Sequence, residues 1–377
     1  MLSSCMCFVI NMQKRLDIRD IKNLLISARN SLNSQLSLSR TKQIKYTERQ
    51  YFDLVSFLSV FGCCAEDGST TMNLCDEVPT GDALLQQLKK QEFSKVELEF
   101  HELYQKQFYE LLPNAKKKKY NAIVIIDVHE QETYSQDKKT SSSIRGGKHK
   151  NGTNYFFKYL TMQVLVKGML ITIGMRFYSR KNQLRKLVDE LIVHAQRFVK
   201  IDVVLLDRGF RDAALLNQLE FRQADVLMPC FKDSKAELCF AELGDKNFRT
   251  SRYSITSQKT KQTADVTLIM IQLMNGKEIG FYTTMKGTWL HSAHYYLNIY
   301  KKRWNIETGY RLQNMFLPKT TSTERVIRFF YFCYAVAMHN LWLVIRQTQK
   351  IGNGFTVLFM KVMLVLFWVT THLPKEW

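Results

Sequence analysis

The period of the hydrophobic pattern changes near residue 115, and this change constrains the fold more than any other feature of the sequence. Between residues 16 and 112, apolar side chains recur every three to four positions in three segments, a spacing typical of helices that bury one face. Past residue 115, continuous apolar runs such as AIVIID (122–127) and IDVVLLD (201–207) have the length and composition of buried strands. The sequence therefore predicts a helical N-terminal domain over residues 1–115, followed by a sheet.

The order of elements after residue 115 predicts an α/β fold with a mixed sheet and flanking helices. Two strand-like segments joined at Lys167-Gly168 follow the first apolar run and predict a hairpin. A segment with helical spacing then leads into the second run, which completes the order strand, hairpin, helix, strand. The predicted parts are a first section of the sheet domain (116–224), a β-rich insertion without a helix (225–290), a second, helical section (291–346) and a C-terminal apolar helix (347–377).

The charge balance indicates a polyanionic partner. The chain of 377 residues has 54 Lys and Arg against 34 Asp and Glu, a formal net charge of +20 at pH 7. A large chain this basic most often meets nucleic acid, and the basic helical segment within the first 50 residues suits phosphate contact or, more simply, a solvated helix face. An anionic membrane surface is the alternative, but no polybasic cluster adjoins an amphipathic anchor.

Two apolar runs near the C-terminus approach the length of a membrane span. They cover residues 326–345 and 355–373, but the first contains Arg328 and His339 and the second contains Lys361. Charged and polar side chains at these positions favour core or interface helices. The sequence therefore predicts no membrane association.

The eight cysteines are irregularly spaced and include no C-x-x-C pair, so they do not suggest a zinc site. A chain of this size does not need disulfides for its stability. Reduced thiols are the expected state, which predicts a cytoplasmic location.

Three carboxylates are the candidates for chemistry. Asp127 and Asp207 each end a buried apolar run, where a sheet can hold side chains rigidly at its edge. The third, Glu307, lies in a helical segment in which Tyr300, Arg303, Glu307, Arg311 and Asn314 are spaced 3, 4, 4 and 3 residues apart and share one stripe.

Taken together, the three carboxylates have the composition of a metal site for phosphoryl transfer. Mg²⁺ prefers hard oxygen ligands, and two such ions can activate an attacking oxygen and stabilise a leaving one. Arg and Tyr neighbours suit the binding of phosphate. On spacing alone, a surface ladder of Arg303, Glu307 and Arg311 remains the simpler interpretation of the helix.

Three motifs carry a resemblance to a known family. The stretches AIVIIDVHE, VVLLDRGF and YKKRWNIETGYR, with RGGKHKNGTNYFFKY and FLPKTTS, resemble the DDE transposases of prokaryotic insertion sequences, in the subgroup with a Y-x2-R-x3-E motif and a β-rich insertion before the final Glu. The resemblance covers about residues 115–345. It implies an RNase H-like catalytic core and two Mg²⁺ or Mn²⁺ ions.

The resemblance also implies roles for single residues. Asp127, Asp207 and Glu307 would hold the metal ions, and Tyr300 and Arg303 would act on the DNA backbone. The family has a Lys seven residues after the Glu, where this chain has Asn314. Arg311 or Lys319 could replace that Lys. The other cations expected to contact DNA are Arg208, Lys148 and Lys150.

The predicted function is that of a DNA transposase that hydrolyses phosphodiesters at the ends of an element and joins the freed 3′-OH to target DNA. Its partner would be double-stranded DNA, bound by a dimer, in the cytoplasm or on the nucleoid. A stand-alone RNase H-like nuclease and a non-catalytic DNA-binding protein derived from a transposase are the alternatives. The intact acids favour an enzyme, and strand joining distinguishes a transposase from a nuclease.

Overall fold

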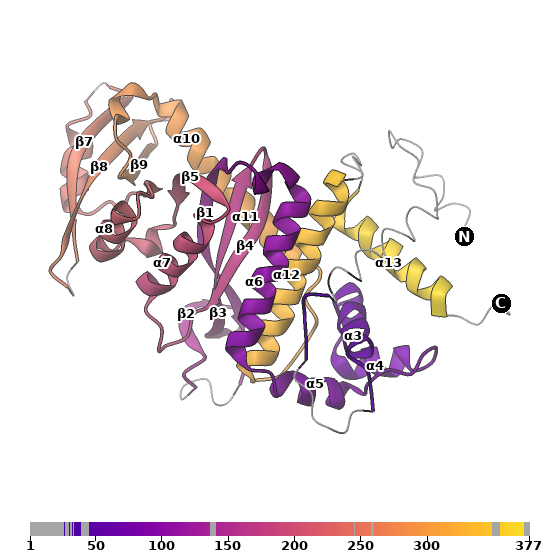
Figure 1. The fold of residues 1–377 in the computed structure, drawn as a ribbon. Coiled ribbons are helices and arrows are strands. Elements are labelled where there is room, and N and C mark those ends of the chain that lie inside the picture. Colours follow the sequence, from indigo (N-terminus) through magenta and orange to yellow (C-terminus); the bar gives the residue numbers. More distant parts are fainter. Residues whose placement is uncertain are drawn as a thin grey trace. The chain divides into compact units, whose positions relative to one another are not determined.

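The chain forms two compact units in the structure, which is a computed structural model (Figure 1). It describes residues 45–135, 141–244, 246–257, 260–348 and 355–372, with a few positions between 26 and 38. Unit 1 combines residues 1–113 with 310–377, and unit 2 comprises residues 114–309. The first boundary lies within two residues of the change in hydrophobic period.

Unit 1 is helical. Its described helices are α3 (Glu48–Phe61), α4 (Ala65–Met72), α5 (Gly81–Lys89), α6 (Phe93–Leu111), α12 (Arg325–Thr348) and α13 (Val357–His372). The helix predicted from residue 16 to residue 32 lies almost entirely outside the described residues. The N-terminal helices therefore pack with helices from the other end of the chain, whereas the sequence placed these segments in separate domains.

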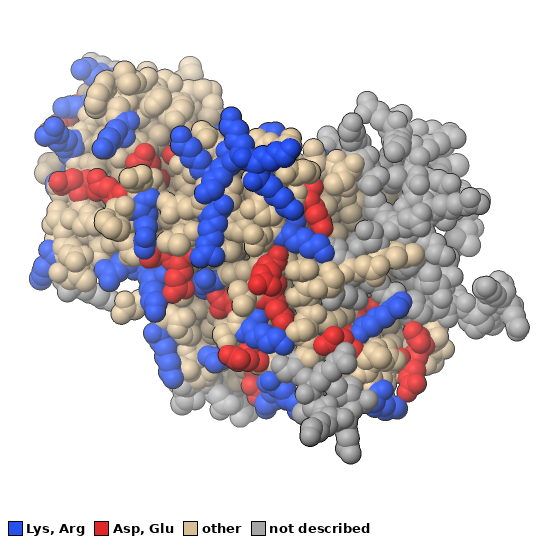
Figure 2. Space-filling model, viewed as in Figure 1, with Lys and Arg blue, Asp and Glu red and all other residues tan. Residues whose placement is uncertain are grey.

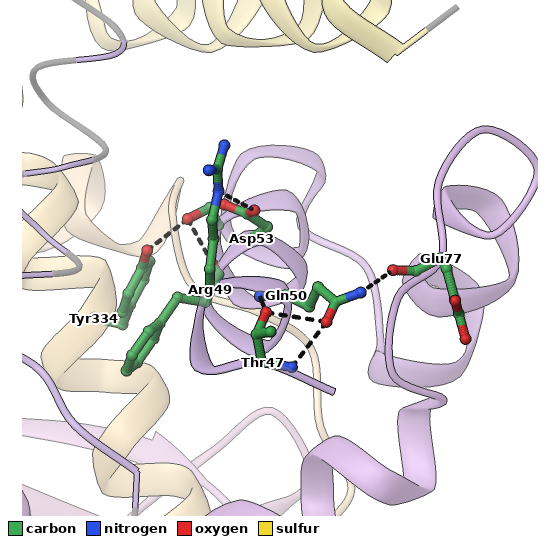
Figure 3. A network of polar contacts seen from close by, with 8 residues as sticks. Thr47, Arg49, Gln50, Asp53, Glu77 and Tyr334 are labelled. Carbon is green, nitrogen blue, oxygen red and sulfur yellow. Dashed lines mark hydrogen bonds and ion pairs between the residues drawn. The ribbon is translucent and has the colours of Figure 1, made fainter. Parts of the chain in front are cut away.

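Helix α3 begins at a capping box, in which two side chains satisfy the free N–H groups of the first turn. The backbone N–H of Gln50 donates to Thr47 Oγ1 at 3.3 Å, and that of Thr47 donates to Gln50 Oε1 at 2.8 Å. Gln50 Nε2 also donates to the Glu77 carbonyl, and Ser56 Oγ lies 2.6 Å from the Tyr334 hydroxyl (Figure 3). This network ties α3 to the segment before α5 and to α12.

Helix α12 is the core of unit 1. Among the described residues it is the one helix long and apolar enough to cross a membrane, and 94% of its apolar window is buried inside the protein. The Tyr104 hydroxyl and the Gln107 amide on α6 donate to carbonyls of α12, at Cys333 and Ala337, both at 2.9 Å. Burial of this extent is that of a core helix, as predicted for residues 326–345.

The described strands of unit 2 form one nine-stranded mixed sheet. Its order is β2-β3-β1-β5-β6-β9-β8-β7, with β4 paired to β3. The strands are β1 (Tyr120–Glu132), β2 (Arg145–Lys150), β3 (Thr153–Val166), β4 (Met169–Phe177), β5 (Val199–Leu205), β6 (Val226–Pro229), β7 (Phe248–Thr256), β8 (Thr263–Gln272) and β9 (Glu278–Thr283). The pairs β1–β5 and β5–β6 are parallel and the other pairs are antiparallel.

Helices and short 3₁₀ turns connect these strands. They are η2 (Pro113–Lys116), α7 (Leu184–Ala195), η4 (Arg208–Phe210), α8 (Ala213–Phe221), α9 (Ser234–Ala241), η5 (Thr288–Leu290), α10 (Ala293–Lys301), η6 (Lys302–Trp304) and α11 (Asn305–Asn314). The predicted apolar face of α7 is buried from Leu187 to Ala195 and packs on β4 and β3. The predicted fold class, a mixed sheet with flanking helices after a helical N-terminal region, is confirmed.

The prediction of a helix-free insertion over residues 225–290 is wrong in two respects. Helix α9 lies within it and is capped by Asp233, whose carboxylate accepts from the Ala236 N–H at 3.0 Å. Its eight residues bury only Ala236 and Phe240, so they are too few to give a clear helical period. The strands also do not form a separate block, because β6 pairs with β5 and β9 pairs with β6, which extends the central sheet.

Candidate active site

Asp127 lies within a long strand rather than at its end. Strand β1 continues to Glu132 because β3 pairs with it throughout, as far as Glu132↔Phe156. The Asp127 backbone carbonyl accepts from Thr161 Oγ1 of β3 at 3.4 Å, and the Asp127 side chain is 19% exposed. The expectation that the strand ends at this acid was therefore wrong, although the side chain still reaches solvent.

Asp207 occupies the matching place beside the neighbouring strand. Strands β1 and β5 are parallel, and Ile125 pairs with Leu205. Asp127 and Asp207 each follow that pair by two residues. The register therefore places both acids level with each other, towards the C-terminal ends of the two parallel strands. Asp207 leads into η4, and its carbonyl accepts from the Phe210 N–H at 3.1 Å.

Tyr300, Arg303 and Glu307 lie on three consecutive elements, not on one helix as predicted. Tyr300 is on α10, Arg303 on the 3₁₀ turn η6, and Glu307 on α11. Although the 3₁₀ turn interrupts the predicted helix, Arg303 and Glu307 still lie close together, with Arg303 Nη2 3.7 Å from Glu307 Oε1.

Arg303 joins the helical segment to the sheet. Its Nη1 lies 3.6 Å from Asp127 Oδ2, and its side chain is 12% exposed. The Tyr300 hydroxyl, from one turn earlier, donates to the carbonyl of Leu206, next to Asp207, at 3.4 Å. The segment that carries Glu307 is therefore attached to both acid-bearing strands.

The three acids influence one another electrostatically. The pKa of Asp127 is raised to about 6, mainly by burial and to a smaller extent by the charges of Asp207 and Glu307, against the lowering effects of Arg303 and the Val128 N–H. Burial also raises the pKa of Tyr300, which keeps its hydroxyl protonated at neutral pH. Ionisation of Asp127 beside the other two acids therefore costs free energy, and a bound cation would offset that cost.

The donor atoms here fit a hard divalent cation in their chemistry, since all three candidate side chains are carboxylates. Among the described residues, however, no three His, Cys, Asp or Glu side chains are grouped closely enough to hold an ion as they are placed. The guanidinium of Arg303 lies between Asp127 and Glu307, and Glu307 is 65% exposed.

The other predicted cations lie in different surroundings. Arg208 follows Asp207 directly and is exposed. Lys148 and Lys150 are exposed on β2, which pairs with β3 beside the last residues of β1, and Lys150 Nζ forms an ion pair with Glu132 at 3.4 Å. All three belong to unit 2, toward the end of β1 that lies past Asp127.

Arg311 and Lys319 belong to unit 1. Arg311 is exposed on α11, four residues after Glu307, and the Lys319 N–H donates to the Cys63 carbonyl at 3.1 Å. Asn314 is the last residue of α11 and is exposed. The roles of these residues on DNA stay predictions.

Gly309 and Gln163 were missed by the sequence reasoning. Gln163 on β3 is 1% exposed, and within the described part of the chain neither of its amide atoms has a hydrogen-bond partner. A Cβ at Gly309 would lie 3.4 Å from that amide, so α11 approaches the sheet closely at this point, two residues after Glu307. A glycine inside the helical motif IETGYR was the available signal.

Comparisons with known proteins bear on the family and the fold of the chain. A family model described as a transposase DDE domain matches residues 121–341. Among solved structures, the chain is similar to a piggyBac transposase in a synaptic complex with hairpin DNA, with 11% identity and a TM-score of 0.54 over 96% of this chain and 81% of that chain. At this identity the likeness concerns the fold. Comparison with curated proteins gives no match.

Proposed function

Because this chain belongs to the transposase DDE domain family, we propose that it is a cut-and-paste DNA transposase. It would hydrolyse phosphodiesters at the ends of a DNA element and transfer the freed strands to target DNA. The observation that supports this best is the placement of Asp127 and Asp207 at one edge of two parallel strands, with Arg303 linking Asp127 to Glu307. The family match also bears out the resemblance of the three motifs to DDE transposases.

Asp127, Asp207 and Glu307 are the residues that would hold Mg²⁺ or Mn²⁺, and we propose two ions. Such ions, when bound, would activate the attacking oxygen and stabilise the leaving oxygen of the phosphodiester. The raised pKa of Asp127 supports the assignment, because buried acids with perturbed pKa values concentrate at functional sites.

Arg303 and Tyr300 would position the DNA backbone. The planar guanidinium of Arg303 has N–H donors that match the oxygens of a phosphate. Tyr300 stays protonated and can donate a hydrogen bond. The exposed cations Arg208, Lys148 and Lys150 would add contacts that orient the duplex without reading its sequence.

The proposed partner is double-stranded DNA, bound by a dimer in the cytoplasm or on the nucleoid. The net charge of +20 supports a polyanionic partner, and the similar solved structure is a transposase complex with hairpin DNA. Arg311 and Lys319 are further candidates for DNA contact, in place of the Lys that the family has where this chain has Asn314.

The test uses a donor plasmid that carries the gene with its native flanking DNA, together with a target plasmid. Wild-type protein with Mg²⁺ is expected to cut at the borders of the element and to join the ends to the target. Asp207→Asn is expected to abolish cutting, while Asp202→Asn, at an exposed position on the same β5 strand, is the matched control. Metal-dependent cutting by Asp207→Asn would falsify the catalytic assignment, and cutting without joining would identify a stand-alone nuclease.

A further inference from the structure

Exposed cations gather at the end of the sheet where β1 and β5 begin. They come from the segment before β1, the turn between β3 and β4, and the residues around the start of β5. This set, which we term the basic edge, consists of Lys117, Lys118, Lys119, Lys167, Arg197 and Lys200, all exposed. Figure 2 shows Lys and Arg side chains gathered on the face in view, at the end of the sheet away from β2.

The strand register brings these separate segments together. Tyr120, the first residue of β1, pairs with Val199, and Asn121 pairs with Lys200. On the other side of β1, the end of β3 lies nearby, because Ile123 pairs with Leu165. Lys167 therefore projects from a hairpin turn next to the start of β1, and the three segments share one edge.

Specific contacts hold part of the basic edge in place. Lys119 Nζ donates to the Gln196 carbonyl at 2.6 Å, at the C-terminal end of α7, where the helix dipole favours a cation. Lys167 Nζ lies 4.2 Å from the ring centroid of Tyr120. The N–H groups of Lys117 and Lys118 both donate to the Asn114 carbonyl at 3.1 Å, which fixes the turn.

Within the part of the chain that the structure describes, none of the six cations of the basic edge forms an ion pair with an acid. Asp202, two residues after Lys200 on β5, is exposed, and Lys200 lowers its pKa against the larger raising effect of burial. The one negative charge of Asp202 cannot neutralise the six positive charges of the basic edge. Like charges at short range repel one another, and a polyanion that binds there would relieve the repulsion.

We propose that the basic edge is a second DNA-binding surface, which holds the phosphates of a duplex segment away from the segment being cut. Seven residues of β1 separate Tyr120 from Asp127, a separation of ~23 Å at ~3.3 Å per residue, or about seven base pairs of duplex. One phosphate cannot touch both places. The proposal rests on the proposed function, because it takes DNA to be the polyanion that binds the basic edge.

The experiment measures binding of a random-sequence 30-bp duplex by fluorescence anisotropy across a series of salt concentrations. The edge variant reverses four charges, at Lys117, Lys118, Lys167 and Lys200, each to Glu. The control variant reverses the charge of two exposed lysines of the insertion, Lys246→Glu and Lys277→Glu. It is compared with the double variant Lys117→Glu/Lys118→Glu, which reverses the same number of charges at the basic edge.

The edge variant is expected to bind at least tenfold more weakly at low salt. The slope of log K against log salt should become shallower by about 2 to 4, since each phosphate contact contributes about 0.9. The Lys246/Lys277 control should change affinity less than threefold. Unchanged binding by the edge variant, or an equal loss in the two matched double variants, would overturn the proposal.

Two further measurements separate this proposal from the function and from misfolding. Lys117→Gln/Lys118→Gln removes charge without reversing it, and its thermal unfolding should match the wild type while its salt slope falls. If the wild-type protein never cuts DNA but keeps an edge-dependent salt slope, the proposed function fails and the basic edge stands. If it cuts DNA and the edge variants bind normally, the basic edge fails alone.

Discussion

The two ends of strand β1 differ in burial and in charge, although one strand connects them. At Asp127 the strand holds a largely buried acid beside a largely buried arginine, and the pKa of Asp127 is raised to about 6, mainly by burial. At Tyr120 the strand is flanked by exposed lysines. Burial amplifies electrostatic effects at one end and solvent screens them at the other. Substitutions are therefore expected to change chemistry and stability at the Asp127 end, and salt-dependent affinity at the Tyr120 end.

The largest difference between the two ends is expected from removal of one arginine at each. Arg303→Ala should reduce DNA cutting about 10²–10³-fold, because a buried cation that meets phosphate acts in a site of low dielectric. Arg197→Ala, at the basic edge, should leave the cutting rate of saturating donor DNA within about threefold. Single-turnover cutting rates measure both. Equal losses in the two variants would remove the distinction between the ends.

A second difference concerns stability and pH. The pKa of Asp127 is raised from 3.8 to about 6 in the folded protein. Between these two pH values the carboxyl is protonated in the folded state and ionised in the unfolded state. Stability therefore falls as pH rises through this window, and above pH 6 the charged form costs about 2–3 kcal/mol.

Asp127→Asn should remove that cost. In the presence of a chelator, the variant should be about 2–3 kcal/mol more stable than the wild type at pH 8 and close to it at pH 3.5. Denaturant unfolding at the two pH values measures this. Lys200→Gln at the basic edge is the control and should show no comparable pH-dependent gain. A variant equally or less stable at pH 8 would contradict the account of Asp127 burial.

The smallest effect is expected where α11 approaches the sheet. Gly309→Ala adds one Cβ at 3.4 Å from the Gln163 amide, an ordinary contact, and should keep cutting within about twofold. Gly309→Leu needs space that the buried Gln163 occupies, so it should displace Glu307 and slow cutting about tenfold. DNA affinity at the basic edge should stay unchanged in both. Full activity of Gly309→Leu would show that this approach does not position Glu307.

Much of the site could be predicted because its parts are local in sequence. The apolar runs that lead to Asp127 and Asp207 are visible as strands, and the spacing of Arg303 and Glu307 places them one helical turn apart whether or not a 3₁₀ turn intervenes. The pairing of Gly309 with Gln163 could not be predicted, since those residues lie 146 positions apart and no local pattern relates one to the other.

The sequence by itself determined where most of the strands and helices lie and which acids follow the two buried apolar runs, because these depend on hydrophobic periods within a few residues. Only the tertiary structure decided that β1 runs past Asp127, that the insertion extends the central sheet, and that lysines and an arginine from three segments share one edge. Each of these depends on which strand pairs with which, and in what register. Register is set by contacts between residues far apart in the chain, so no local pattern records it.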